Sequence, residues 1–220
     1  MRKGGKFTDS NNGALVSFEG IDGSGKSTQA RALAQTLQDR GYDVVLTREP
    51  GGAVGAEAIR RLLVEGDPNR WSAETEILLF NAARRDHLEK TILPALASGK
   101  IVITDRFADS TRIYQGAARA SLRPLVDKLH ALVIGIEPDL TFLIDMNPKA
   151  ALARGLARRS GEDRFEELGL EFQESLHHGF LDLARDNPGR IRVVDGARPV
   201  AEISTDVAHQ MQDWLKARTP

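Results

Sequence analysis

The sequence predicts an α/β fold, a three-layer sandwich in which a five-stranded parallel sheet is flanked by helices on both faces. Two observations carry this prediction. Five short apolar runs, rich in β-branched residues, recur along the chain, and longer segments with helical periodicity separate them. The short runs are continuously apolar rather than alternating, which is typical of strands buried on both faces.

The elements follow one another in βα order. The predicted strands are ALVSFE (14–19), DVVLTR (43–48), KIVITD (100–105), LTFLID (140–145) and RIRVVD (190–195). The amphipathic segments between and after them predict helices over 27–39, 54–65, 72–97, 121–133, 149–159, 166–185 and 199–218. The last helix carries spaced apolar residues and is expected to pack on the sheet.

The length and composition are typical of a globular protein. With 220 residues, 41% hydrophobic and 28% charged, the sequence predicts one domain over residues 13–220, preceded by a polar, mobile tail at 1–12. No apolar run is long enough for a membrane span, and the first residues lack the apolar core of a secretory signal. A net charge of -1 argues against general nucleic-acid binding, and the absence of Cys is compatible with a cytoplasmic location.

The segment FEGIDGSGKST (18–28) contains a phosphate-binding pattern. Gly20, Gly25, Lys26 and Ser27 satisfy G-x-x-x-x-G-K-[ST] between a predicted strand and a predicted helix. Glycines let backbone N–H groups turn inward around a phosphate, and the helix N-terminus adds partial positive charge. We therefore predict a P-loop in which Lys26 reaches the terminal phosphates and Ser27 offers its hydroxyl to magnesium.

A second motif, VITDRF (102–107), delivers Asp105 and Arg106 at the end of a buried strand. Ligands of doubly wound sheets bind at the carboxyl ends of the strands. We expect Asp105 to hold magnesium, directly or through water, and Arg106 to hold a phosphate by a bidentate contact. A surface Asp-Arg pair that caps the strand is the alternative, and the neighbouring P-loop pattern disfavours it.

Two arginine-containing segments are candidates for contacts with the nucleotides. In LLFNAARRDH (78–87), Phe80 and Arg84 lie four residues apart on one helical face, where they could stack on a nucleobase and bond its carbonyl oxygen, or simply be a core residue and its neighbour. In RGLARRSGEDRFE (154–166), the arginines could neutralise the migrating phosphoryl group on a segment that closes over the nucleotide, or form an exposed basic helix end.

Together these motifs resemble those of the bacterial thymidylate kinases, a family of P-loop nucleoside monophosphate kinases. The matching segments are FEGIDGSGKST, TREPGG (47–52), LLFNAAR (78–84), DRFADSTRIYQG (105–116), and DLTFLID (139–145) followed by RRSGEDRFE (158–166). They occur in the family's order and spacing from about residue 14 to 166, and VVDGARPV (193–200) matches more weakly. The P-loop is shared with many families, whereas the REPGG, LLF and DRF segments are more discriminating.

The resemblance implies an enzyme that phosphorylates dTMP to dTDP with ATP and Mg2+, and it implies a homodimer. ATP would be bound by Gly20, Ile21, Asp22, Gly23, Ser24, Gly25, Lys26, Ser27 and Thr28, and the metal by Ser27 and Asp105. Phe80 would stack on thymine, Arg84 would bond its ring carbonyl, and Arg48 and Arg106 would grip the dTMP phosphate. Asp22, Ser110, Thr111, Tyr114 and Gln115 would complete this pocket, with Tyr114 near the C2′ of the sugar.

Two positions depart from what some family members carry. Gly23 stands where some members have a catalytic arginine, and members with glycine there place the arginine on a lid. Besides Lys26 and Arg106, the catalytic candidates are therefore Arg154, Arg158 and Arg159, with Arg164 also on the lid segment near 154–166. Ala53 follows the two glycines of TREPGG where a threonine is usual, which removes a hydroxyl from that spot.

Two other functions stay open on the sequence alone. A deoxynucleoside kinase would need a carboxylate base for a neutral hydroxyl acceptor, and Glu49 could serve. A nucleotide-dependent switch of the GTPase kind should carry N-K-x-D, which NPKA (147–150) does not match. An acceptor phosphate, by contrast, is already an anion near neutral pH and needs no base, so arginines, Lys26 and magnesium would suffice.

Overall fold

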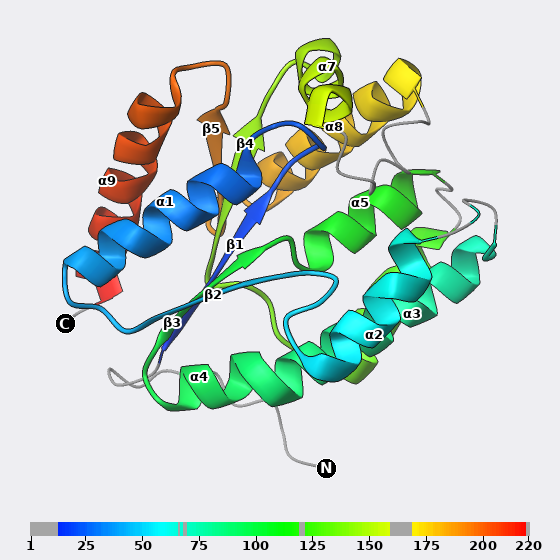
Figure 1. The fold of residues 1–220 in the computed structure, drawn as a ribbon, viewed down its shortest axis with the longest axis horizontal. Helices are drawn as coiled ribbons and strands as arrows, with labels where there is room; N and C mark the ends of the chain where they lie inside the picture. The colour runs from blue at the N-terminus through cyan, green and yellow to red at the C-terminus, as the bar shows by residue number, and fades with distance from the viewer. Residues whose placement is uncertain (1–12, 66, 68–69, 119–121, 159–168, 219–220) are drawn as a thin grey trace.

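The protein is described here by a computed structural model that covers residues 13–65, 67, 70–118, 122–158 and 169–218 (Figure 1). The predicted lid segment near 154–166 and the predicted tail at 1–12 therefore lie largely or wholly outside the described residues.

One parallel sheet forms the middle layer, as predicted. Its strands are β1 (Ala14–Glu19), β2 (Val44–Arg48), β3 (Ile101–Asp105), β4 (Leu140–Asp145) and β5 (Ile191–Asp195), in the spatial order β2-β3-β1-β4-β5. Each ladder is parallel, so the carboxyl ends of all five strands meet at one edge. The fold-class prediction is confirmed, and each strand starts or ends within one residue of its predicted bound.

The helices agree with the predicted segments, with one addition. They are α1 (Lys26–Asp39), α2 (Val54–Val64), α3 (Ala73–His87), α4 (Leu93–Ala97), α5 (Ala108–Ala118), α6 (Arg123–Leu129), α7 (Pro148–Arg158), α8 (Gly169–Asp186) and α9 (Val200–Arg218). Two π-helical turns, η1 (Leu88–Ile92) and η3 (His130–Ile134), extend α3 and α6. The predicted helix 72–97 is thus α3, η1 and α4 in succession.

Helix α5 was not among the predicted helices. Its sequence, ADSTRIYQGAA, is dominated by weak helix formers: Asp, Ser, Thr, Ile, Tyr and Gly. Tertiary contacts stabilise it instead, because Ile113 and Tyr114 pack against α8 and the side chain of Glu19 binds its first backbone N–H groups. Local propensity could not reveal a helix that depends on a partner far away in sequence.

Helices cover both faces of the sheet (Figure 1). Helices α1 and α9 pack on one face around Phe18 and Phe142, whose rings lie 5.3 Å apart. Helices α5 and α8 and the turns η1 and η3 cover the other face around Leu15, Val102 and Leu143. Among the described residues, no helix is long and apolar enough to cross a bilayer. The two packed layers leave the carboxyl edge of the strands open for a site.

Candidate functional site

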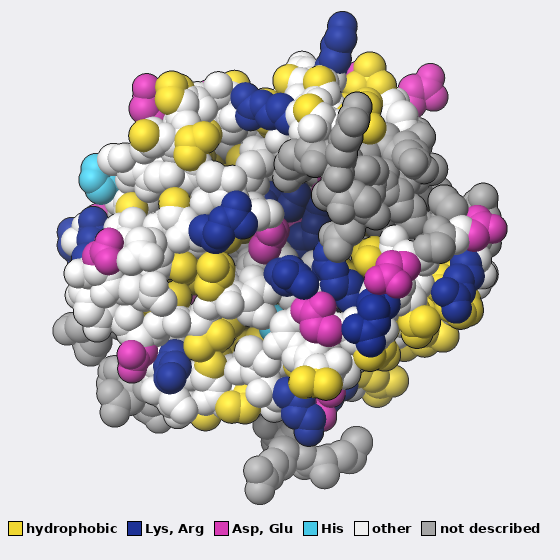
Figure 2. Space-filling view, in the orientation of Figure 1, with side chains coloured by type: hydrophobic (Ala, Val, Ile, Leu, Met, Phe, Trp, Pro, Cys, Tyr) yellow, Lys and Arg dark blue, Asp and Glu magenta, His cyan; other side chains and the backbone are white. Residues whose placement is uncertain are grey.

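Three adjoining cavities lie at the carboxyl edge of the sheet. The acceptor cavity lies between β3, α2, α3 and α5, the phosphate cavity lies over the P-loop and β2, and the third cavity lies between the P-loop, α7 and the turn before α9. Lys and Arg side chains gather around the hollow at the centre of this face (Figure 2). The cavities share residues of the P-loop, so ligands in them would be in contact.

The P-loop connects β1 to α1 and leaves the helix N-terminus uncapped. Gly25 precedes α1 with φ 101°, a left-handed conformation that favours glycine, and it offers no side chain to the first N–H groups. Helix α1 also has no acidic residue in its first turn. These N–H groups and the helix dipole are therefore available to an anion.

Lys26 is buried at the start of α1. Its Nζ donates to the carbonyl of Ile21 at 2.9 Å and lies 3.8 Å from the Asp22 carboxylate. Burial, followed by the nearby Arg106 guanidinium, lowers the pKa of Lys26 to about 8. Phosphate oxygens in the cavity would add further negative charge beside this buried ammonium group.

Gly23 has a steric reason to be glycine. A Cβ at this position would lie 1.9 Å from the carbonyl oxygen of Ala151 on α7, and φ is 81°. Helix α7 therefore approaches the loop so closely that no side chain fits there in this conformation. That a catalytic arginine is supplied from elsewhere stays a prediction.

Ser27 and Asp105 are brought together, as predicted from two distant motifs. The Ser27 hydroxyl donates to Oδ2 of Asp105, while Asp105 Oδ1 is buried with no hydrogen-bond partner among the described residues. An unpartnered buried carboxylate oxygen beside a hydroxyl suits a hard cation with oxygen ligands. Neither here nor elsewhere in the described ranges do three or more His, Cys, Asp or Glu form a cluster that could hold a metal ion.

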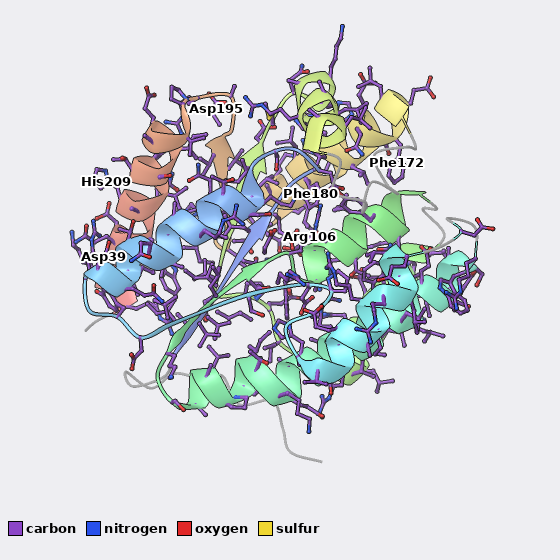
Figure 3. The ribbon with its side chains drawn as sticks, viewed as in Figure 1. Asp39, Arg106, Phe172, Phe180, Asp195 and His209 are labelled. Carbon is purple, nitrogen blue, oxygen red and sulfur yellow. The ribbon has the colours of Figure 1, made fainter. Side chains whose placement is uncertain are left out.

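Arg106 is the centre of the polar network between the acceptor and phosphate cavities, and Figure 3 labels it near the middle of the molecule, beside α5. Its Nη2 donates to Asp22 Oδ1 at 2.5 Å and to Tyr114 Oη at 3.0 Å, and its Nη1 donates to Ser110 Oγ at 2.8 Å. Its φ of 73° is unusual for a residue with a side chain. Three partners hold the guanidinium in this strained turn, where it faces both cavities.

Charge pairing dominates the electrostatics of this network. Burial by itself would raise the pKa of Asp22, but Arg106 and Lys26 outweigh it and hold that pKa well below its usual range. Burial also raises the pKa of Tyr114 well above its ordinary value, so the phenol stays protonated and donates to Asp22 Oδ2 at 2.7 Å. The network therefore holds its charges in fixed places near neutral pH.

Glu19, the last residue of β1, supports this network by binding the start of α5. Its Oε1 accepts from the N–H groups of Phe107 and Ser110 at the start of α5, and its Oε2 accepts from Ser110 Oγ at 2.6 Å. Ser110 in turn holds Arg106. Burial, followed by the nearby Asp109 carboxylate, raises the pKa of Glu19 to about 7, although these donors favour the charged form.

This pKa predicts a pH-dependent contribution to stability. Because the folded pKa exceeds the unfolded value of 4.5, the contribution is fully present below pH 4.5 and is lost as pH rises through 7. Between pH 5.5 and 8, we expect the unaltered chain to lose on the order of 1–3 kcal/mol of unfolding free energy relative to Glu19→Gln. Urea unfolding of both chains at the two pH values measures this, and an unchanged difference would contradict the assignment.

Phe80 and Arg84 line the acceptor cavity from α3, so they do share one side of a site as the spacing suggested. Arg84 is only 3% exposed. Its Nε donates to Glu49 Oε2 at 2.6 Å, and its Nη2 donates to Thr111 Oγ1 at 2.9 Å and to the carbonyl of Phe107 at 3.2 Å. The guanidinium is therefore held by α5 and by the segments that follow β2 and β3 before any ligand binds.

The remaining residues predicted for dTMP lie nearby. Eight of the nine line the acceptor cavity; the exception is Arg48, which lines the phosphate cavity and pairs with Glu57 at 3.2 Å. Of the residues predicted for ATP, Ile21 is buried in the core, so only its backbone is available. Gly23 and Gly25 line both the phosphate and the third cavity, and Ser24 and Thr28 line the third.

Of the candidate catalytic arginines at positions 154–164, the structure describes the side chain of Arg154 only. Arg154 lines the third cavity, where its Nη1 lies 3.3 Å from Met146 Sδ, and it is not among the residues of the phosphate cavity. The side chain of Arg158, and all of Arg159 and Arg164, lie outside the described residues. These roles therefore stay predictions.

Comparisons with known proteins show the family of this chain. The family model of thymidylate kinase matches residues 18–207. The chain belongs to the thymidylate kinase family. It is 72% identical to the thymidylate kinase of Dinoroseobacter shibae over 195 residues, which is 89% of this chain and 94% of the relative. It is 64% identical to the thymidylate kinase of Ruegeria pomeroyi over 198 residues, which is 90% of this chain and 94% of the relative.

A solved structure extends the match to three dimensions. The crystal structure of thymidylate kinase from Ehrlichia chaffeensis superposes with a TM-score of 0.75 at 37% identity, covering 91% of this chain and 99% of that one. The resemblance, the α/β fold class and the prediction of a dTMP kinase are thus confirmed.

Sequence reasoning on this family member missed several residues of the site. Arg60 of α2 lines both the acceptor and the phosphate cavity, and its Nη1 donates to the carbonyl of Pro50 at 2.6 Å. Arg198 and Pro199, in the turn before α9, line the third cavity. The segment VVDGARPV (193–200) was a signal for this turn, whereas a helical arginine such as Arg60 had no motif to mark it.

Proposed function

We propose that the chain transfers the γ-phosphoryl group of ATP to the phosphate of dTMP across the phosphate cavity, with Mg2+ as cofactor. The observation that carries this proposal is the order of the cavities: a base-sized pocket with Phe80 and Arg84, then a phosphate cavity over the P-loop, then a third cavity against α7 and the turn before α9. Two nucleotides that enter from opposite sides would meet with their phosphates over Lys26.

On the donor side, the P-loop binds the phosphates of ATP. The N–H groups at the start of α1 contact phosphate oxygens, and Lys26 neutralises charge as it moves from donor to acceptor. The third cavity, with Arg154 and the turn containing Arg198, accommodates the nucleoside of ATP.

Ser27 and Asp105 would hold the proposed Mg2+. Mg2+ prefers few protein ligands, retains waters and binds substrate phosphates, which matches one carboxylate and one hydroxyl. When bound, it neutralises phosphate charge. Support comes from the buried Oδ1 of Asp105, which has no hydrogen-bond partner in the described part of the chain.

On the acceptor side, dTMP lies with its base against Phe80 and its ring carbonyl at Arg84. Arg106 and Arg48 bind its phosphate, and Tyr114 lies near the sugar C2′, while Asp22, Ser110, Thr111 and Gln115 complete the pocket. Ionic contacts from the two arginines orient the phosphate anion for attack. No proton has to be removed from the acceptor, so the chemistry needs no general base.

This last point bears on the deoxynucleoside kinase alternative. Glu49, the candidate base, already uses Oε2 for Arg84 and Oε1 for His87, at 2.6 and 3.1 Å. A carboxylate bound in this way is poorly placed to accept a proton from a sugar hydroxyl. The engaged state of Glu49 therefore supports a phosphate acceptor over a hydroxyl acceptor.

We also propose that residues 13–220 act as one kinase domain with a lid near 154–166, that the protein is a homodimer, and that it works in the cytoplasm. The dimer is supported by large apolar side chains exposed on adjacent elements, Leu78 of α3 and Leu132 of η3, which are 55% and 81% exposed. The location is supported by the absence of Cys and by the ATP requirement.

The test of the function is an acceptor panel. ADP release from ATP and Mg2+ is measured with dTMP, dUMP, dCMP, dAMP, dGMP and thymidine as separate acceptors. A strong preference for dTMP is expected. Turnover of thymidine without dTMP would favour a nucleoside kinase, and hydrolysis that no acceptor stimulates would favour a switch.

Asp105→Asn tests the metal assignment. The amide removes one negative charge from the proposed site, so we expect the Mg2+ concentration for half-maximal activity to rise by about tenfold or more. Initial rates over a Mg2+ titration measure this, with Asp127→Asn on α6 as a control that lines none of the three cavities. An unchanged Mg2+ requirement would contradict the role of Asp105.

A further inference from the structure

The proposed function leaves one buried titratable side chain next to the acceptor cavity without a role. His87 is the last residue of α3, three residues after Arg84, and is 0% exposed. It faces the carboxyl end of β2, where Thr47 and Glu49 lie. Buried polar side chains are normally hydrogen-bonded, so the partners of His87 show what it does.

Both ring nitrogens of His87 are engaged. Nδ1 lies 3.1 Å from Glu49 Oε1, and Nε2 lies 2.7 Å from Thr47 Oγ1. A carboxylate only accepts, so Nδ1 carries the proton and donates to Glu49, and Nε2 shares a hydrogen bond with the Thr47 hydroxyl. The backbone of Gly52 closes the remaining side, because a Cβ there would lie 2.3 Å from His87 Nε2. The ring is therefore held in one place.

Glu49 carries this fixed position on to Arg84. Its second oxygen, Oε2, accepts from Arg84 Nε at 2.6 Å, so one carboxylate joins the histidine to the arginine. Arg84 Nη2 is bound to Thr111 and Phe107. In the described ranges no hydrogen bond involves Arg84 Nη1. With Nε and Nη2 occupied, Nη1 is the nitrogen left to donate to a ligand in the acceptor cavity.

We propose that His87 is a positioning residue: through Glu49 it sets the orientation of Arg84, and thereby the preference for a pyrimidine with a carbonyl oxygen at ring position 4 over one with an amino group. This rests on the proposed function. A carbonyl accepts from Nη1, whereas an amino group would present its own N–H to that donor and leave both unpaired. Such discrimination requires a guanidinium that cannot turn away.

The experiment measures kcat and KM of the full chain with dTMP and with dCMP. For His87→Leu we expect the ratio of kcat/KM for dTMP over dCMP to fall about tenfold, mainly through a higher KM for dTMP. His87→Asn, whose amide can still donate to Glu49, is expected to keep the ratio within about threefold of the parent. Rescue by this conservative variant distinguishes positioning from simple packing.

His130→Leu is the matched control. His130 is also buried, and its Nε2 pairs with Glu137 at 3.0 Å, but it lines none of the three cavities. We expect this variant to lower the thermal midpoint without changing the dTMP to dCMP ratio. Thr47→Val removes the other contact of the His87 ring and serves if His87→Leu does not fold; a smaller fall in the ratio is expected.

The outcomes are separable. Absence of dTMP turnover by the unaltered chain would overturn the proposed function and this inference with it. Normal turnover combined with an unchanged ratio in His87→Leu, or in Thr47→Val if the first does not fold, would overturn this inference alone. His87 would then be a core residue that stabilises the fold without affecting selectivity.

Discussion

Lys26→Met is expected to lower the rate of phosphoryl transfer by about a thousandfold while the fold is kept. Lys26 is the positive side chain at the N-terminus of α1 and lies in the phosphate cavity. Loss of one pre-positioned donor to developing negative charge typically costs about 10²–10³ in kcat, and this donor is charged. Steady-state ADP release at saturating ATP and dTMP measures the effect.

Stability should respond differently from activity in this variant. Burial lowers the pKa of Lys26 to about 8, so near neutral pH the folded chain carries an ammonium group that its surroundings disfavour. Removing that charge offsets the lost bond to the Ile21 carbonyl, and we expect an unfolding free energy within about 1 kcal/mol of the parent. Lys216→Met, at an exposed position of α9, is the control with full activity. If Lys26→Met is inactive because it is unfolded, the loss of activity is not due to the missing charge, and this prediction is wrong.

Glu49→Gln is expected to destabilise the protein by about 3–5 kcal/mol, or roughly 6–20 °C in thermal midpoint. Glu49 and Arg84 form an ion pair in which both side chains are only 3% exposed. The amide has nearly the same shape but no charge, so the Arg84 guanidinium is left buried without its counterion. Removal of one partner of a buried pair is costly because the other charge cannot reach water. Differential scanning calorimetry measures the shift.

An exposed pair between α3 and η1 supplies the comparison. Arg85 and Glu89 pair at 2.5 Å, with side chains 48% and 45% exposed. Glu89→Gln should cost only about 0–1 kcal/mol. The double variant Glu49→Gln with Arg84→Met should recover part of the stability without recovering dTMP turnover. Equal losses from the exposed and the buried pair would show that burial does not govern this interaction.

The sequence motifs marked residues that the structure places together at one edge of the sheet, and the topology of the sheet explains why. The P-loop directly follows β1, Asp105 ends β3 and Arg106 follows it, so parallel pairing alone brings them to one edge of the sheet. Ser27 and Asp105, 78 residues apart, meet for this reason. Phe80 and Arg84 share a helical face, which the four-residue spacing already indicated.

Side chains that act through others were not visible in the sequence. Glu19 is the last residue of β1, and nothing in the neighbouring sequence indicates that its side chain binds the start of α5. Thr47 belongs to the matched segment TREPGG and His87 ends the motif LLFNAARRDH, but the two touch only because β2 and α3 pack together. Helix α5 escaped prediction for the same reason, since its residues favour a helix only once Glu19 and α8 are in place.

By itself the sequence determined the order of strands and helices, the P-loop and the family, because these depend on local patterns and on motifs at fixed spacing. Tertiary structure alone decided which charges are already paired. In the sequence Glu49 is one carboxylate among many, whereas in the fold it is the counterion of Arg84. Gly23 could be any flexible loop residue in the sequence, whereas in the fold it is the point where α7 approaches the P-loop closely. Pairing and steric exclusion depend on distances between segments far apart in the chain, and only packing sets those distances.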